Sequence, residues 1–144
     1  MPQVGSPPGR RVVMGLLWTS AVVTVLYWVT FFTSGDVQSS EAECYLAFER
    51  AFPAADLWLA AACVVAAEGL RRRREWAVLF GIAAGSATVY LGCMDVLYNL
   101  QNGMYATWSP PMAGEMIINL FCFTFGPFLL AWFWRNRRFA EARA

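Results

Sequence analysis

Four blocks of about 20 consecutive apolar residues restrict what this chain can fold into more than any other feature of its sequence. A soluble domain of this length would show alternating or one-sided apolar patterns, because part of each element faces water. Blocks that are apolar all round have the length of a helix that crosses about 30 Å of hydrocarbon. The chain is 58% hydrophobic and only 15% charged, against about 25% charged in an ordinary soluble domain. We therefore expect an all-α, polytopic membrane protein built as a four-transmembrane-helix bundle.

The apolar blocks define the domain organisation. The predicted spans cover about residues 12–33, 51–70, 76–100 and 110–134. They form one transmembrane domain at 12–138, between a flexible N-terminus at 1–11 and a short tail at 139–144. The first block is longer than the apolar core of a signal peptide, which has about 7 to 15 residues, so we expect it to be an uncleaved anchor.

Local signals place the helix ends between the first two spans. Ser40 and Glu43 have the spacing of a capping box, which predicts a helix that starts near Glu41, outside the membrane. Proline in a helix interior removes a hydrogen bond, so the second span is expected to kink or to restart at Phe52-Pro53. A similar kink is expected at Gly126-Pro127 in the fourth span.

The third span contains glycines at small-x-x-x-small spacing, Gly81 and Gly85, which lets helix backbones approach closely. Packing within the bundle is favoured over a homodimer contact. On the first span, hydroxyl side chains are expected to make hydrogen bonds to other helices. These are Thr19, Ser20, Thr24 and Thr30.

Arginines predict the orientation. In a four-span topology, one side of the membrane receives Arg10, Arg11, Arg71, Arg72, Arg73, Arg74, Arg135, Arg137, Arg138 and Arg143. Only Arg50 falls on the other side. The positive-inside rule makes the arginine-rich side cytoplasmic, so both termini are predicted inside, in the cell inner (plasma) membrane. Arginine in place of lysine also suggests a GC-rich bacterial genome. Binding of anionic membrane lipid is a secondary interpretation of the clusters.

The missing residue types exclude several chemistries. All 11 basic residues are arginine, and there is no histidine. Retinal or pyridoxal Schiff bases, histidine-ligated haem and an imidazole general base are therefore excluded. The four cysteines stand singly, without a Cys-x-x-Cys pair, and a Cys44–Cys93 disulfide is left open. We expect no cofactor, no metal site and no nucleic-acid partner.

Three acidic residues lie inside the predicted spans: Asp56, Asp95 and Glu115. A charge at the centre of a spanning helix costs about 2.5 to 3.5 kcal/mol, and somewhat less near the edge. At 1.5 Å per residue, the three carboxyl groups reach about the same depth on three different helices. Asn99 lies four residues after Asp95, and Asn119 four residues after Glu115, so each polar face is extended by one turn.

These faces predict an outward-facing acidic and aromatic pocket. Its predicted ligand-binding residues are Asp56, Asp95, Glu115, Asn99, Asn119, Glu49, Arg50, Trp58 and Tyr98. Plainer interpretations stay open. Asp56 could favour a helix N-terminus, Asp95 could form a structural ion pair with Arg50, the asparagines could join neighbouring helices, and the aromatic residues could serve packing.

The pocket leads to three hypotheses of function. Carboxylates this close cannot all stay ionised, so some bind protons or a cation completes the site, and the first hypothesis is binding or transport of a cation, proton, small amine or lipid-like ligand. The second is a non-catalytic subunit of a membrane complex. The third is an enzyme. In outline, four spans with intramembrane acids resemble the sterol-isomerase and emopamil-binding (EXPERA) family, which implies acid–base chemistry on a lipid-like substrate. The absence of histidine departs from the isomerase pattern, and the catalytic residues and the oligomeric state are unknown.

Overall fold

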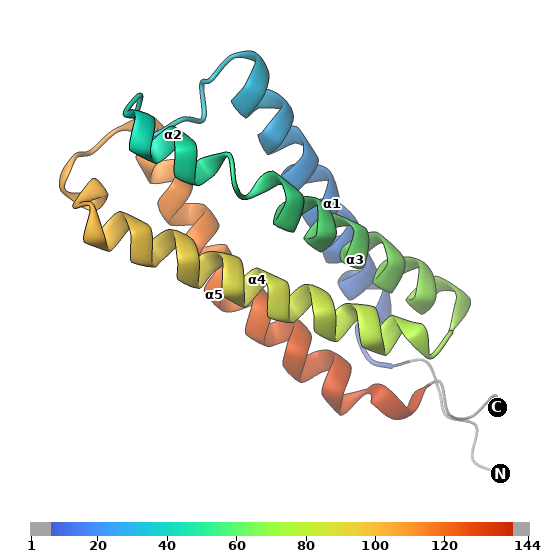
Figure 1. Cartoon of the computed structure of the whole chain (residues 1–144). Coiled ribbons are helices and arrows are strands. Elements are labelled where there is room, and N and C mark those ends of the chain that lie inside the picture. The colour runs from blue at the N-terminus through green and yellow to red at the C-terminus, as the bar shows by residue number, and fades with distance from the viewer. Residues whose placement is uncertain (1–6, 140–144) are drawn as a thin grey trace, which may run out of the picture.

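The computed structural model describes residues 7–139 and is built from helices joined by short connections (Figure 1). The elements are α1 (Arg10–Thr33), α2 (Glu43–Glu49), α3 (Pro53–Arg72), α4 (Trp76–Gln101), the 3-10 turn η1 (Met104–Ala106), α5 (Pro110–Arg135) and the 3-10 turn η2 (Arg137–Phe139). Four helical segments are long and apolar enough to cross a membrane. They are α1, the combined segment of α2 and α3, α4, and α5. The prediction of an all-helical chain with four such segments is confirmed. Of the predicted N-terminus at 1–11 and tail at 139–144, residues 1–6 and 140–144 lie outside the described residues.

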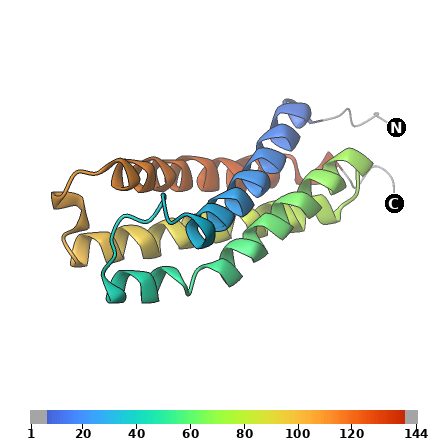
Figure 2. The same cartoon turned by 90° about the horizontal axis from the view of Figure 1, so that it is seen from above.

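The long helices pack in chain order. α1 packs on α3, α3 on α4, and α4 on α5. Figure 2 shows α5 lying along α4, with α1 and α3 on the other side of α4. The start of α1, the α3–α4 connection and the end of α5 lie at one end of the bundle (Figure 1).

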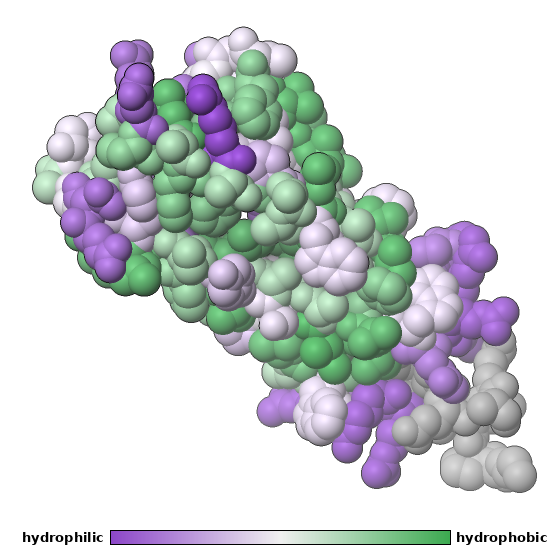
Figure 3. Space-filling view, in the orientation of Figure 1, coloured by the Kyte–Doolittle hydropathy of each residue, from purple (hydrophilic) through white to green (hydrophobic). Residues whose placement is uncertain are grey.

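The two ends of the bundle differ in charge. One end, called here the arginine end, carries Arg10, Arg71–Arg74 and Arg135. The opposite end, called here the acidic end, carries α2 and η1. On the face seen in Figure 3, hydrophilic residues gather at the two ends and apolar residues cover most of the surface between them. Large apolar side chains point outward from every long helix. Examples are Val22, Leu26, Leu57, Leu79, Ile117 and Leu120. Such a surface suits lipid rather than water.

The helix break before the second long segment is confirmed. α2 ends at Glu49 and α3 restarts at Pro53, where the missing N–H of proline leaves no hydrogen bond unmade. The prediction of a capping box is wrong, although the helix begins only two residues beyond Glu41. The N-cap is Ala42, without a side-chain hydrogen bond, because the Ser40 hydroxyl accepts from the Ala42 N–H (3.1 Å) instead.

α4 and α5 approach each other through glycine. A Cβ built on Gly85 would lie 2.9 Å from the carbonyl oxygen of Gly126, and a Cβ on Gly81 would enter the ring of Phe133. The small-x-x-x-small pair therefore serves packing within the bundle. α5 runs as one helix through Pro127.

All four cysteines are free. Cys44 and Cys93 are exposed, while Cys63 and Cys122 are buried among the helices. The Cys44–Cys93 disulfide is not formed.

Candidate functional site: an acidic cavity between the helices

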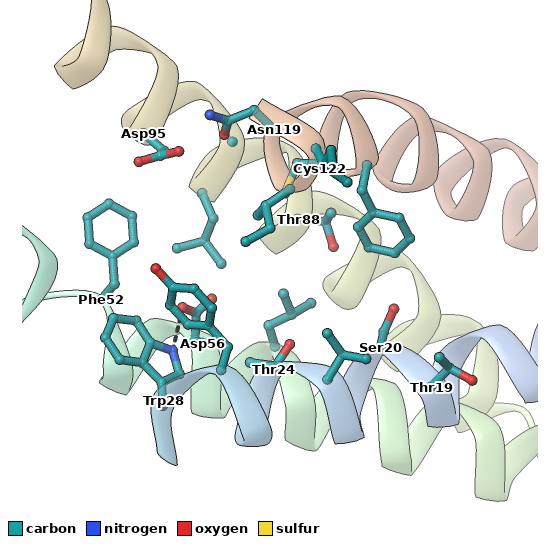
Figure 4. Close-up of a pocket in the computed structure, with 18 of the residues that line it drawn as sticks. Thr19, Ser20, Thr24, Trp28, Phe52, Asp56, Thr88, Asp95, Asn119 and Cys122 are labelled. Atoms are coloured by element: carbon teal, nitrogen blue, oxygen red, sulfur yellow. Dashed lines mark hydrogen bonds between the residues drawn. The ribbon is translucent and has the colours of Figure 1, made fainter. Parts of the chain in front are cut away.

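A cavity of about 390 Å³ lies among α1, α3, α4 and α5 (Figure 4). Most of its wall is apolar, with Leu59 and Leu91 among the lining residues. Three carboxyl groups join this wall. They belong to Glu49, Asp56 and Asp95. The sequence predicted that all three would share a pocket, and the structure brings them together.

Asp56 occupies the first turn of α3 and faces α1. The indole Nε1–H of Trp28 donates a hydrogen bond of 2.8 Å to its carboxylate (Figure 4). The start of a helix favours a negative charge by about 0.3 to 1 kcal/mol. Both features orient the carboxylate, but an indole is a neutral donor and leaves the negative charge unbalanced.

Asp95 lies beside Asn119 of α5, at the part of the cavity nearest the acidic end of the bundle (Figure 4). The Asn119 amide donates a hydrogen bond of 3.1 Å to the hydroxyl of Tyr105 in η1. Burial raises the pKa of Tyr105, so its hydroxyl stays protonated at neutral pH. Asn119 lines the cavity and is only 5% exposed. Its amide oxygen is buried and has no hydrogen-bond partner.

No arginine neutralises these acids within the part of the chain that the structure describes. Arg50 is exposed and forms no ion pair with another described residue, and Arg71 and Arg72 form ion pairs with Glu68 at the arginine end. The interpretation of Asp95 as the partner of Arg50 in a structural ion pair is therefore wrong. The helix break at residues 50–52 follows Glu49, whose side chain faces the cavity while that of Arg50 faces outward.

Glu115 and Asn99 form a separate buried cluster. The Tyr45 hydroxyl donates to one carboxylate oxygen of Glu115 (2.6 Å), and the Asn99 amide donates to the other (3.0 Å). The Ser39 N–H donates in turn to the Tyr45 hydroxyl (3.1 Å). Glu115 is 4% exposed and does not line the cavity. The single predicted pocket is thus two neighbouring polar groups.

Trp58 and Tyr98 also lie off the cavity wall. Trp58 is 53% exposed on the outer surface of α3. Tyr98 stacks on Phe48 of α2, with 3.9 Å between ring centroids. Neither residue lines the cavity, and the stacked contact of Tyr98 agrees with the packing interpretation.

Several lining residues were not predicted as ligand-binding. They are the aromatic residues Tyr27, Trp28 and Phe52 and the hydroxyl residues Thr19, Ser20, Thr24 and Thr88. The prediction that hydroxyl residues of the first helix bond to other helices is wrong for two of them. Thr30 bonds to the Leu26 carbonyl of its own helix (3.0 Å), and the Ser20 hydroxyl is buried without a partner. The spacing of residues 20, 24 and 27 on one helix face was the available signal.

The cavity reaches the side of the bundle between α1 and α5. Val23 of α1 is 56% exposed and Ile117 of α5 is 68% exposed, yet both line the cavity. The cavity is therefore open to the outer surface of the bundle beside these two residues.

Residues 7–139 contain no group of three or more cysteine, aspartate or glutamate side chains arranged to hold a metal ion. No protein-family model, no curated protein and no solved structure shows significant similarity to the chain. These comparisons therefore add nothing to the outline resemblance to the EXPERA family.

Proposed function

We propose that this protein is a multi-pass protein of the cell's plasma membrane, with both termini inside, and that it binds a small lipophilic amine. The observation that carries the proposal is the cavity: Glu49, Asp56 and Asp95 all line it, its wall is mostly apolar, and none of the three forms an ion pair with an arginine of the described residues. Taking a carboxylate out of water is unfavourable unless a positive charge or hydrogen bonds compensate it. An ammonium group supplies that compensation.

An organic ammonium suits this cavity better than a metal ion. Ca²⁺ takes six to eight oxygen ligands and Mg²⁺ demands nearly ideal octahedral geometry, whereas the described residues hold no cluster of three suitable ligands. An ammonium group needs only carboxylates and aromatic faces. Tyr27 and Trp28 line the same wall as Asp56. The volume of about 390 Å³ lies within the range of small-molecule sites, about 300 to 1,000 Å³.

The opening between α1 and α5 supports entry from the bilayer. The amine reaches the cavity along its apolar rim, at Val23 and Ile117, and its charged group then meets the acids inside. A ligand with an alkyl body and one ammonium group satisfies both the apolar wall and the carboxylates. We take octylamine as the simplest probe of this class.

The test is isothermal titration calorimetry of octylamine with the purified protein in detergent. Asp95→Asn and Asp56→Asn each remove one countercharge and are expected to weaken binding about tenfold or more. Asp36→Asn, in the exposed loop after α1, is the matched control and should leave the affinity unchanged. Lowering the pH should also weaken binding in the wild type, because protonated carboxyl groups no longer attract the ammonium.

The proposal fails if octylamine binds the wild type, Asp56→Asn and Asp95→Asn with the same affinity. Equal affinity would mean that the amine partitions into the micelle or onto the apolar surface. Binding that increases as the pH falls would also contradict it.

A further inference from the structure

A second polar feature of the cavity lies away from the acids. Figure 4 shows Thr88 of α4 and Ser20 of α1 with their hydroxyls on the cavity, at a distance from Asp95 and Asn119. Thr88 is only 1% exposed. Its hydroxyl donates to the Ala84 carbonyl of its own helix (2.8 Å), which leaves the oxygen lone pairs free to accept.

The Ser20 hydroxyl is buried and has no hydrogen-bond partner. Leaving a buried hydroxyl unpaired costs about 1 to 3 kcal/mol, and buried polar groups in proteins are nearly always paired. Ser20 can donate and accept, and Thr88 can accept. A neutral group that also donates and accepts, such as an alcohol, matches both residues.

The separation of the two polar regions follows from α4. Asp95 and Thr88 are seven residues apart on this helix, which at 1.5 Å per residue is about 10 Å along its axis. Between them the wall includes Leu91 and Gly92 and offers no charge. A molecule that spans both regions therefore has polar groups at its two ends and an apolar body.

We propose that Ser20 and Thr88 form a hydroxyl-binding subsite, and that the ligand is an elongated amino alcohol with its hydroxyl about 10 Å from the ammonium group. This subsite rests on the amine-binding function proposed above. It adds the second recognition element, which selects among lipophilic amines by the position of a hydroxyl group. The amine end is held by Asp56 and Asp95.

The test compares two isomers by titration calorimetry. In ω-aminooctanol the hydroxyl is at the far end of the chain, and in the control isomer it is on the carbon next to the one that bears the amine. The isomers partition differently into detergent, because a terminal hydroxyl leaves no free apolar tail, so each titration is corrected by a blank titration of the same isomer into protein-free micelles. The wild type is expected to bind ω-aminooctanol about three to ten times more tightly, the value of one or two net hydrogen bonds.

Variants assign this preference to the subsite. The double variant Ser20→Ala with Thr88→Val should bind both isomers equally, while its binding of octylamine, which has no hydroxyl, should still depend on Asp95. Ser20→Ala alone changes a partly exposed residue of α1, and it should lose part of the preference even if the double variant folds poorly. Thr88→Ser retains the hydroxyl and should retain the preference.

Two results overturn the subsite while leaving the amine function intact. One is equal binding of the two isomers to the wild type, and the other is an undiminished preference in the double variant, each with octylamine binding that still depends on Asp95. If octylamine does not bind the wild type, or binds Asp95→Asn equally well, the proposed function itself fails and the subsite falls with it.

Discussion

Glu115 is a buried carboxyl group that accepts hydrogen bonds from two neutral donors, Tyr45 and Asn99. Tyr45 is 1% exposed and connects α2 to α5 through this contact. Tyr45→Phe removes one donor from Glu115 and leaves the Ser39 N–H without its acceptor. We expect it to lower the free energy of unfolding by about 0.5 to 2 kcal/mol, measured by thermal denaturation in detergent.

A matched control for this change is Tyr90→Phe. Tyr90 lies on α4 and is 62% exposed, so its hydroxyl should contribute almost nothing to the free energy of unfolding. Equal destabilisation by Tyr45→Phe and Tyr90→Phe would contradict the structural role of the Tyr45–Glu115 hydrogen bond.

Depth was predictable from the sequence for single residues, but the direction of each side chain was not. Counting 1.5 Å per residue placed Asp56, Asp95 and Glu115 at one level. Asp56 and Asp95 do line one cavity, whereas Glu115 turns to Tyr45 in α2. That difference depends on the rotation of α5 about its axis and on where the short helix α2 docks. Neither can be read from a chain whose spans are apolar all round.

At the scale of elements, α4 and α5 are held at the distance that two glycines allow. Gly85→Leu would place a Cβ 2.9 Å from the Gly126 carbonyl oxygen and 3.1 Å from the Leu129 Cβ. Backbone cannot yield as a flexible side chain does, so the helices must separate. We expect a loss of about 1 to 3 kcal/mol or more in the free energy of unfolding, read as a lower melting temperature in detergent.

Gly15→Leu provides the comparison for this prediction. Gly15 also lies inside a helix, but nothing is within 4 Å of a Cβ built on it. Leucine is the better helix former of the two residues, so this change should be neutral or stabilising. If Gly15→Leu and Gly85→Leu behave alike, close packing does not explain the glycines of α4.

The start of α3 could be predicted from the sequence, but the N-cap of α2 could not. The restart at Pro53 follows from covalent chemistry, since proline lacks an N–H, and it appears where expected. The capping box failed because Ser40 has a second acceptor role available in the loop, toward the Ala42 N–H. Ser, Thr and Asn side chains compete between such local bonds, and spacing alone does not decide the outcome.

At the scale of the whole molecule, the feature that best predicts the orientation in a membrane is the separation of arginines and cavity acids along the bundle. Arginines at the start of α1, in the α3–α4 connection and at the end of α5 meet at the arginine end (Figure 1). Antiparallel packing of four long helices brings these distant segments together, as the arginine counts required. The cavity acids lie towards the other end, on α2, α3 and α4.

This arrangement predicts a topology that reporter fusions can test. Arginines close to a membrane end stay on the cytoplasmic side, so alkaline phosphatase fused near Ser39 or Ala106 should be active, because it is exported. A fluorescent reporter that folds only in the cytoplasm should be bright when fused near Arg73 or at the C-terminus. Four crossings demand this alternation, whereas three or five would place one arginine group outside.

Replacing Arg71–Arg74 with glutamine should weaken the retention of the α3–α4 connection in the cytoplasm, so the difference in signal between inside and outside fusions should shrink. Replacing the exposed Arg50 should leave that difference unchanged. A cytoplasmic signal from the fusion near Ser39 or near Ala106 would contradict the four-span topology.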